Sequence, residues 1–238
     1  MNIALIGYGK LGQAIEKIAV ARGHSIAIKI GIENLEDFTE QNLKNVDVAI
    51  ESTSPESAFE NISQLLSWGV PVVSGSTGWT QRLEEVEAYC VEKGGAFLYA
   101  SNFSLGVNIF FELNKKLAAL MAHQPDYAIE IEEIHHTQKK DAPSGTAITI
   151  AEGIMSQNPQ KQKWENYSSM DKNVLPIISK RIDPAPGTHS VRYTSDVDDI
   201  EITHTAHNRT GFASGAVIAA EFLLHKKGVF SMRDVLGL

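Results

Sequence analysis

The sequence predicts an α/β protein, in which a doubly wound parallel sheet is followed by a second, α+β domain built on a mixed sheet. Two observations lead to this prediction. Strand-like and helix-like stretches alternate over residues 2–100, which is the order that a parallel sheet with crossover helices requires. Later in the chain, three strand-like runs follow one another without helices between them, which indicates mixed or antiparallel pairing.

Composition narrows the class of protein. The 238 residues can form one large or two modest domains, and 43% hydrophobic content is ordinary for a protein with a real core. A formal charge of -8, with no basic stripe, argues against nonspecific binding to nucleic acid. No apolar run approaches the roughly 20 residues of a membrane span, and the first expected strand leaves no room for a signal peptide. We therefore expect a cytoplasmic protein with neither nucleic acid nor membrane as a partner.

The single cysteine, Cys90, excludes a disulfide within the chain. It lies in a helical pattern with Leu83 and Val86, where a small apolar residue is expected. This placement favours a structural role over a nucleophilic one.

The first strand, residues 2–6, leads into a glycine loop and a helix. Gly7 permits a tight turn, Gly9 permits the close approach of a pyrophosphate, and Gly12 permits the helix to pack on the strand. The N-terminus of the helix would then meet the phosphates. A Gly-x-Gly-x-x-Gly motif in this strand-loop-helix context predicts a Rossmann-like dinucleotide site.

The second strand, residues 25–30, bears on the choice of cofactor. An enzyme strict for NAD should carry an acidic residue near its end to bind the adenosine ribose, but Lys29 stands there and Glu33 lies farther along. Lys29 or Lys10 could instead face a 2′-phosphate, and an exposed lysine without a ligand is an equal alternative.

The remaining elements of the parallel sheet follow in turn. Ser54 and Pro55 suit the start of a helix after a strand over residues 46–50. A further strand over residues 70–74 is followed by the loop Gly75-Ser76-Thr77-Gly78, which should face the ligand crevice of a parallel sheet. A helix over 80–93 and a strand over 96–100 complete the alternation.

The second domain is expected to begin with a helix that carries Ile109, Leu113 and Leu117. We expect strands over residues 177–182, 189–194 and 200–206, after a polar excursion over 156–174, and a last helix that returns to the first domain. The two domains would join near Ser101 and Gly211. Their expected bounds are residues 1–102 with 212–238 for dinucleotide binding, and 103–211 for substrate binding and oligomerisation.

The most informative stretch is residues 129–147. Ile129 and Ile131 alternate with glutamates, as in a half-buried strand that ends at two histidines. A lysine loop follows, and Ser144 is a good N-cap for a helix whose first N–H groups, at Gly145 and Thr146, can bind an anion. Imidazole, ammonium and a helix N-terminus together predict a site for an anionic substrate that exchanges a proton near neutral pH. A surface turn or core histidine is the plainer alternative.

The run His-His-x-x-Lys-x-Asp-Ala-Pro-Ser-Gly-Thr-Ala, residues 135–147, strongly resembles the signature of the 4-hydroxy-tetrahydrodipicolinate reductase (dihydrodipicolinate reductase) family. Residues 51–55 resemble its Asp-Phe-Thr-x-Pro, with Glu51 and Ser52 as departures, and residues 75–78 resemble its Gly-Thr-Thr-Gly. Residues 100–108 and 209–216, the latter beginning at Arg209, also resemble family segments.

The resemblance implies a role for each matching residue. His135 would be the acid/base and Lys139 its companion proton donor. The expected substrate contacts are His136, Lys139, Ser144, Gly145 and Thr146. The expected cofactor contacts, from the glycine loop and the resemblance together, are Gly7, Tyr8, Gly9, Lys10, Leu11, Gly12, Lys29, Thr53, Gly75, Ser76, Thr77, Ala100, Ser101, Asn102 and Phe103.

The family implies NADH or NADPH as cofactor, a small dicarboxylate substrate of the diaminopimelate route to lysine, and a homotetramer. No metal is implied, because His135 and His136 are adjacent and point to opposite faces of a strand. By rough family position Arg181 and His189 would border the substrate cleft, with surface roles as an equal alternative. Two other functions stay open: a different Rossmann dehydrogenase, such as a semialdehyde dehydrogenase with a reactive cysteine, and a nonenzymatic NAD(P)-binding regulator.

Overall fold

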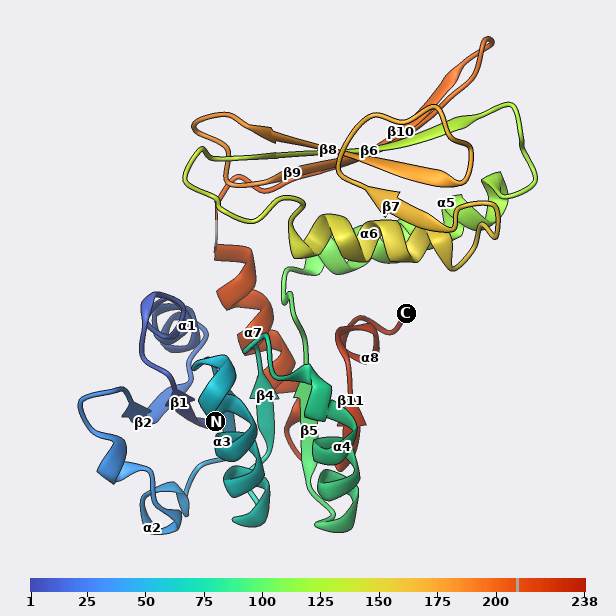
Figure 1. The fold of residues 1–238 in the computed structure, drawn as a ribbon. Coiled ribbons are helices and arrows are strands. Elements are labelled where there is room, and N and C mark those ends of the chain that lie inside the picture. The colour runs from blue at the N-terminus through green and yellow to red at the C-terminus, as the bar shows by residue number, and fades with distance from the viewer. Residues whose placement is uncertain (209) are drawn as a thin grey trace. The chain divides into compact units, whose positions relative to one another are not determined.

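A computed structural model describes residues 1–208 and 210–238 (Figure 1). Arg209, which opens one of the segments that resemble the family, lies outside the described residues. The chain forms two compact units, which are treated separately below. Unit 1 comprises Met1–Leu105 and Thr210–Leu238, and unit 2 comprises Gly106–Arg209.

Unit 1 is built on a six-stranded sheet in the order β11-β5-β4-β3-β1-β2, and every adjacent pair is parallel. This confirms the predicted doubly wound parallel sheet. The elements of unit 1 are β1 (Asn2–Ile6), α1 (Lys10–Ala21), β2 (Ser25–Ile30), the 3₁₀ helix η1 (Leu35–Asp37), α2 (Glu40–Leu43), β3 (Val48–Glu51), α3 (Pro55–Ser67), β4 (Val72–Ser74), the 3₁₀ helix η2 (Thr80–Arg82), α4 (Leu83–Glu92), β5 (Ala96–Tyr99), α7 (Thr210–Leu223), β11 (Gly228–Phe230) and α8 (Met232–Leu236).

Helices cover both faces of this sheet, because successive strand residues point to opposite sides. Ile3 and Leu5 of β1 face a core made with α1, α7 and α8. Ala4 and Ile6 of the same strand face a second core made with α2, α3 and α4. The last long helix, α7, therefore belongs to the first unit, as the sequence predicts.

Several short elements of unit 1 were missed in the sequence. The strand β11 follows Lys226 and Lys227 and contains only three residues, too few for a periodic pattern. The 3₁₀ helix η1 and the helix α2 lie in a polar stretch, and only Leu43 of these two elements is buried. Elements this short carry no periodic pattern that the sequence could reveal.

Unit 2 contains a five-stranded mixed sheet in the order β10-β9-β6-β8-β7. The central strand β6 pairs in parallel with β8 and antiparallel with β9, which confirms the predicted mixed sheet. Helices α5 and α6 pack on one face of the sheet (Figure 1). The elements are α5 (Leu105–Met121), β6 (Ala128–His135), α6 (Gly145–Met155), β7 (Lys163–Glu165), β8 (Val174–Arg181), β9 (Thr188–Thr194) and β10 (Asp199–Thr205).

The sequence predicts only a polar connecting segment over residues 156–174, and this prediction is incomplete. The segment contains the short strand β7, and β8 begins at Val174 rather than at Ile177. Proline has no backbone N–H to donate to a strand ladder, so Pro176 makes residues 174–176 look unlike a strand in the sequence. In the structure that donor is not needed on the β6 side, since the pairing between β6 and β8 begins only at Ile177.

Cys90 is fully buried in unit 1, and its Sγ lies 3.6 Å from the carbonyl oxygen of Gly228. Burial raises the pKa of this thiol to about 11. Both facts agree with the predicted structural role. No helix among the described residues is long and apolar enough to cross a membrane.

Candidate functional site

Four polar side chains meet inside unit 2 because of strand register. Glu133 and His135 have the same parity on β6 as the buried Ile129 and Ile131, and both are buried. Glu133 lies opposite His189 of β9, and His135 lies beside Arg181 of β8. Three strands therefore bring a carboxylate, two imidazoles and a guanidinium together at one end of the sheet.

Glu133 is the centre of this cluster. Its Oε1 accepts a hydrogen bond from Arg181 at 3.1 Å. Its Oε2 accepts the backbone N–H of Ser144 at 3.1 Å and lies 3.5 Å from His135 Nδ1 and 3.7 Å from His189 Nε2. A fully buried carboxylate needs such partners, because leaving its charge uncompensated would cost several kcal/mol.

These contacts set the proton affinities of the cluster. Burial acts to raise the pKa of Glu133, but hydrogen bonds from Ser144, Ser179 and Arg181 outweigh it and hold the pKa below its ordinary value. Burial lowers the pKa of His135, and the nearby charge of Glu133 partly opposes this shift. Burial also lowers the pKa of His189, to about 4. Near neutral pH the structure therefore favours an ionised Glu133 beside neutral imidazoles.

His135 is only 8% exposed, and the approach to its ring is shaped by a glycine. A Cβ on Gly187 would lie 3.2 Å from His135 Nε2, so a side chain there would crowd that nitrogen. The other ring nitrogen, Nδ1, is buried and has no hydrogen-bond partner among the described residues. Nδ1 thus lies near the Glu133 carboxylate without forming a hydrogen bond to it, whereas Nε2 faces Gly187.

The loop after β6 carries Lys139 and is tied down by Arg181. The guanidinium donates to the backbone carbonyl of Asp141 at 2.5 Å as well as to Glu133. The Lys139 ammonium donates to both carboxylate oxygens of Asp141 at 2.8 Å, and this hydrogen bond lowers the pKa of Asp141. An incoming carboxylate would therefore compete with Asp141 for Lys139.

Ser144 caps α6, as the sequence predicts. Its hydroxyl accepts the N–H of Ala147 at 3.2 Å and lies 3.2 Å from His189 Nε2. Ser144 is 3% exposed, so its hydroxyl and N–H both serve the internal network. The next residues differ: Gly145 is exposed, Thr146 is half-buried, and a helix offers no internal acceptor for its first N–H groups.

His136, by contrast, directly follows the strand and is half-buried. Its charge contributes to the lowered pKa of Asp183, which mainly reflects hydrogen bonds from Thr137. The two adjacent histidines thus have different surroundings, with His135 in the buried cluster.

The glycine loop of unit 1 has the shape that a pyrophosphate site requires. Gly7 has φ +96°, and a Cβ there would lie 2.1 Å from the carbonyl oxygen of Ser52. A Cβ on Gly12 would lie 2.4 Å from the Gly7 carbonyl oxygen, whereas one on Gly9 would meet no atom within 4 Å. The chain is therefore tightly packed behind Gly9 and open beside it, at the start of α1. Such a cradle fits a dinucleotide.

Lys29, at the end of β2, is held by two neighbours. Its Nζ lies 3.2 Å from a carboxylate oxygen of Glu16 and 4.8 Å from the centre of the Tyr8 ring. The Tyr8 hydroxyl donates to the same Glu16 carboxylate. Lys10 and Leu11 stand at the first turn of α1, with Lys10 exposed. The structure thus places Lys29 beside Tyr8 of the glycine loop but pairs its charge with Glu16.

The other predicted cofactor residues lie after the carboxyl ends of parallel strands in unit 1. Thr53 follows β3, and Gly75, Ser76 and Thr77 follow β4. A Cβ on Gly75 would lie 2.8 Å from the Phe103 ring, so this ring packs directly on the loop. Ala100 and Phe103 are buried, Asn102 is half-buried, and Ser101 and Thr77 are exposed. The predicted residues therefore form two sets, one in each unit.

Sequence reasoning missed Glu133 and left Arg181 and His189 undecided. The surface alternative is wrong for His189, which is 5% exposed. The available signal was parity, since Glu133 falls on the buried side of β6. Glu133, His135 and His189 each offer an atom that could bind a metal ion, and these three atoms lie within 4.8 Å of one another. The Arg181 guanidinium and the Ser144 N–H already compensate this carboxylate.

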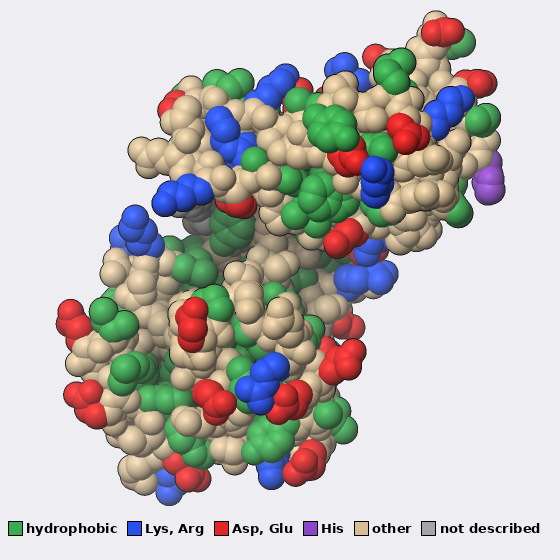
Figure 2. Space-filling model, viewed as in Figure 1, with side chains coloured by type: hydrophobic (Ala, Val, Ile, Leu, Met, Phe, Trp, Pro, Cys, Tyr) green, Lys and Arg blue, Asp and Glu red, His purple; other side chains and the backbone are tan. Residues whose placement is uncertain are grey.

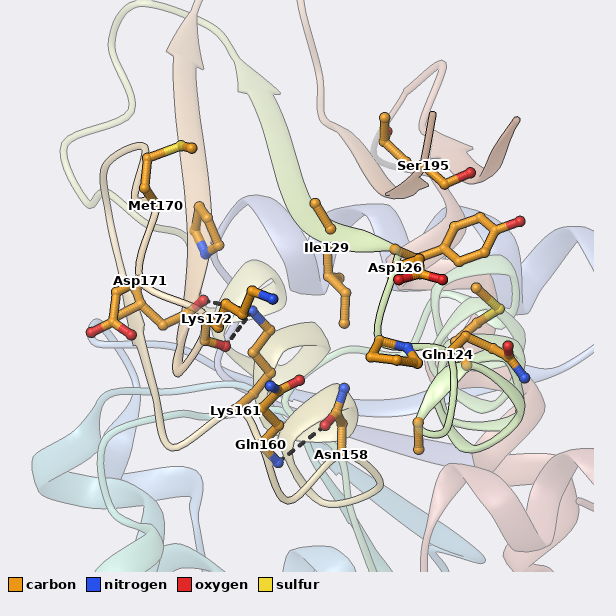
Figure 3. A pocket seen from close by; sticks show the side chains of 18 of the residues that line it. Gln124, Asp126, Ile129, Asn158, Gln160, Lys161, Met170, Asp171, Lys172 and Ser195 are labelled. Carbon is orange, nitrogen blue, oxygen red and sulfur yellow. Dashed lines mark hydrogen bonds between the residues drawn. The ribbon is translucent and has the colours of Figure 1, made fainter. Parts of the chain in front are cut away.

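A cavity lies elsewhere in unit 2, among residues 121–197. It has a volume of about 840 Å³ and is lined by residues that include Ile129, Lys161 and Asp171 (Figure 3). Lys161 donates to the carbonyl oxygens of Lys172 and Val174. None of the predicted site residues lines this cavity. On the face drawn in Figure 2, acidic and basic side chains are interspersed over each unit.

Comparisons with known proteins assign the chain to one family. Residues 1–103 match the family described as "Dihydrodipicolinate reductase, N-terminus", and residues 106–236 match "Dihydrodipicolinate reductase, C-terminus". The chain is 51% identical over 241 residues to a 4-hydroxy-tetrahydrodipicolinate reductase of Christiangramia forsetii, with 100% of this chain and 98% of that protein covered. It is 36% identical over 198 residues to one from Methanoregula boonei, which covers 82% of this chain and 76% of that protein.

A solved structure shares the fold. A dipicolinate-bound dihydrodipicolinate reductase from Paenisporosarcina sp. TG-14 has a TM-score of 0.78, with 24% identity and 97% of each chain covered. An amine dehydrogenase from Mycobacterium smegmatis is more distant, with a TM-score of 0.61, 9% identity, and 97% of this chain and 94% of that chain covered.

The buried His189 makes the stability of the chain depend on pH. Its pKa is about 4 when folded and 6.5 ordinarily, so between these values the unfolded chain binds more protons and stability rises with pH. Between pH 4 and 6.5, we expect the free energy of unfolding to rise by up to about 3 kcal/mol less in His189→Gln than in the unaltered protein. Urea unfolding at several pH values measures it, and His207→Gln, at an exposed position of the same unit, is the control. A pH dependence unchanged in His189→Gln would contradict the assignment.

Proposed function

Because this chain belongs to the dihydrodipicolinate reductase family, we propose that it catalyses the NAD(P)H-dependent reduction of 4-hydroxy-tetrahydrodipicolinate to tetrahydrodipicolinate in the diaminopimelate route to lysine. The main support for this proposal comes from the surroundings of His135. A buried histidine at the end of β6 lies next to a loop lysine and a capped helix N-terminus, which together suit an anionic substrate that exchanges a proton.

The substrate carboxylates would be held by Lys139, His136 and the first N–H groups of α6, at Gly145 and Thr146. A dianion would displace Asp141 from Lys139 and so replace one carboxylate by another. Ser144 has a different part, since both its N–H and its hydroxyl are bonded inside the cluster. It would position the helix start for substrate rather than offer its hydroxyl.

His135 would manage the proton. Its lowered pKa keeps the ring neutral near pH 7, so it is a strong acid once it has taken up a proton. The ionised Glu133 beside it stabilises that protonated form, and Arg181 holds both Glu133 and the loop of Lys139 in place. Lys139 is the second possible proton donor.

A bound NADH or NADPH would supply the hydride. The open space beside Gly9, backed by Gly7 and Gly12, fits its pyrophosphate, and Tyr8, Lys10 and Leu11 belong to the same loop. Lys29 would lie toward the adenosine ribose, and the loops after β3, β4 and β5 toward the nicotinamide. We propose that the chain accepts both cofactors, because no acidic side chain ends β2 and a 2′-phosphate would compete with Glu16 for the Lys29 ammonium.

The assembly and location are also proposed. One face of the unit 2 sheet is packed against α5 and α6, and β10 is largely exposed. An open sheet face of this kind supports an interface between copies, and the family resemblance suggests a homotetramer. We propose a cytoplasmic enzyme that acts on a free small molecule.

The direct test is an absorbance assay of NADH and NADPH oxidation. The substrate is generated in the same reaction by the synthase that precedes this step in the diaminopimelate route. Oxidation that depends on the synthase product supports the reductase. Nucleotide-induced thermal stabilisation without turnover would instead favour a nonenzymatic regulator. A semialdehyde dehydrogenase is disfavoured by Cys90, whose thiol is buried and has a raised pKa.

Three variants should separate the roles in the central motif. His135→Ala should act mainly on kcat, by about 100-fold or more, because proton transfer is lost. Lys139→Ala should lower kcat and raise KM, since the ammonium serves binding and transition state alike. His136→Ala should mainly raise KM. Steady-state kinetics measure these effects, with cofactor affinity as the control for an intact unit 1. Near-normal kcat in His135→Ala would remove it as the acid.

The pH profile offers an independent test of His135. Only its protonated form can donate, and burial lowers its pKa, so kcat/KM should fall as pH rises through a value below 6.5. This limb should vanish in His135→Asn, which retains a polar side chain but does not titrate. A limb that persists unchanged in that variant would assign the titration to another group.

Cofactor choice can be tested at Lys29. Lys29→Gln removes the charge without placing an acid beside Glu16, and it should weaken NADPH more than NADH if the ammonium meets the 2′-phosphate. Dissociation constants for both cofactors measure this, with Lys17→Gln, an exposed lysine on α1, as the control. Equal effects on the two cofactors would make Lys29 a structural partner of Glu16 only.

A further inference from the structure

We propose that Glu51 is a positioning residue of the cofactor site, which fixes the two loops that face the nicotinamide half of the dinucleotide. The inference rests on the proposed function, because it assumes that unit 1 binds a dinucleotide. It concerns a residue that departs from the family pattern in the sequence.

Glu51 is the last residue of β3 and is fully buried. Its Oε2 accepts the Ser74 hydroxyl at 2.6 Å. Its Oε1 accepts the Ser76 hydroxyl at 2.7 Å and both the hydroxyl and the N–H of Thr53, at 2.5 and 2.9 Å. One carboxylate thus binds its own loop and the end of β4 together. All four contacts have Glu51 as acceptor, as an ionised carboxylate requires.

The charge of Glu51 is compensated in an unusual way. Among the described residues, no lysine, arginine or histidine forms an ion pair with it, so hydroxyl and N–H groups stabilise it alone. Charge-assisted hydrogen bonds of this kind are about twice as strong as neutral ones, and a lost donor would leave a buried charge poorly solvated. The donors are therefore held with their hydrogens directed at Glu51.

This arrangement decides what the loops can offer a ligand. The Thr53 hydroxyl donates to Glu51 and accepts from Ser57 and Asn61, at 3.0 and 3.2 Å, so its hydrogen-bonding capacity is used. The Ser76 hydroxyl donates to Glu51 and accepts the Thr53 N–H at 2.8 Å, which leaves one lone pair. Ser76 is only 5% exposed, so its hydroxyl, like that of Ser144, serves the internal network and acts on a ligand by holding these loops in place.

Strand order places these loops on one half of the cofactor. The glycine loop follows β1, with β2 on one side of β1 and β3 and then β4 on the other. In a doubly wound sheet the pyrophosphate meets the glycine loop and the adenosine ribose lies toward β2. The loops after β3 and β4, which Glu51 ties together, therefore face the nicotinamide half.

The test compares a whole cofactor with its adenosine half. Calorimetric titration of the full chain with NADH and with ADP-ribose gives both dissociation constants. Glu51→Gln replaces an acceptor oxygen by an N–H₂ that opposes the hydroxyl donors. We expect NADH affinity to fall about 10-fold or more, while ADP-ribose affinity changes by less than about twofold. Asp47→Asn, a half-buried acid just before the opposite end of β3, should change neither.

Two outcomes would overturn the inference: equal losses for both ligands, which indicate general damage to unit 1, or no loss for either. If Glu51→Gln fails to fold, Ser76→Ala removes one donor only and should weaken NADH selectively by a smaller factor. Unaltered protein that binds neither ligand would contradict the dinucleotide site itself. Normal binding without turnover would contradict only the proposed reaction.

Discussion

The buried Glu133 carboxylate is the interaction on which the unit 2 site depends. It lies on the central strand, contacts Arg181 of one neighbouring strand and His189 of the other, and accepts the N–H of Ser144 at the start of α6. Removing one partner of such a buried pair typically costs about 3–5 kcal/mol, since a charge is left uncompensated. Strand register, loop position and helix start are therefore coupled through one side chain. Arg181 extends this coupling to the loop of Lys139 through the Asp141 carbonyl.

The two units use buried carboxylates in different ways. Glu133 accepts hydrogen bonds from Ser144, from Ser179 and from the Arg181 guanidinium and lies beside an imidazole, which suits a site where a proton moves. Glu51 is surrounded by hydroxyl and N–H donors and ties two loops together without a cation among the described residues. The first arrangement tunes proton affinity, and the second fixes the direction of hydrogen bonds. Both place a negative charge at the end of a central strand, where side chains of neighbouring strands converge.

Much of this organisation can be predicted from the sequence, because it rests on local periodicity. The parallel sheet, the mixed sheet and the glycine loop follow from strand and helix patterns, and the buried position of His135 follows from its parity with Ile129 and Ile131. The partners of His135 cannot be predicted this way. Glu133 and His189 are 56 residues apart in sequence, and only antiparallel register places them opposite each other. Likewise, Glu51 looks like a departure in the sequence, and its hydrogen-bond partners become visible only when β4 supplies Ser74 and the following loop supplies Ser76.

The charge of Glu133 raises the pKa of His135 against the effect of burial. An NMR titration of the His135 ring in the unaltered protein and in Glu133→Gln tests it directly. Glu132→Gln, on the opposite face of the same strand and paired with Lys180, is the matched control. We predict that the pKa of His135 falls further in Glu133→Gln and stays unchanged in the control. An unchanged or raised pKa in Glu133→Gln would contradict the claim.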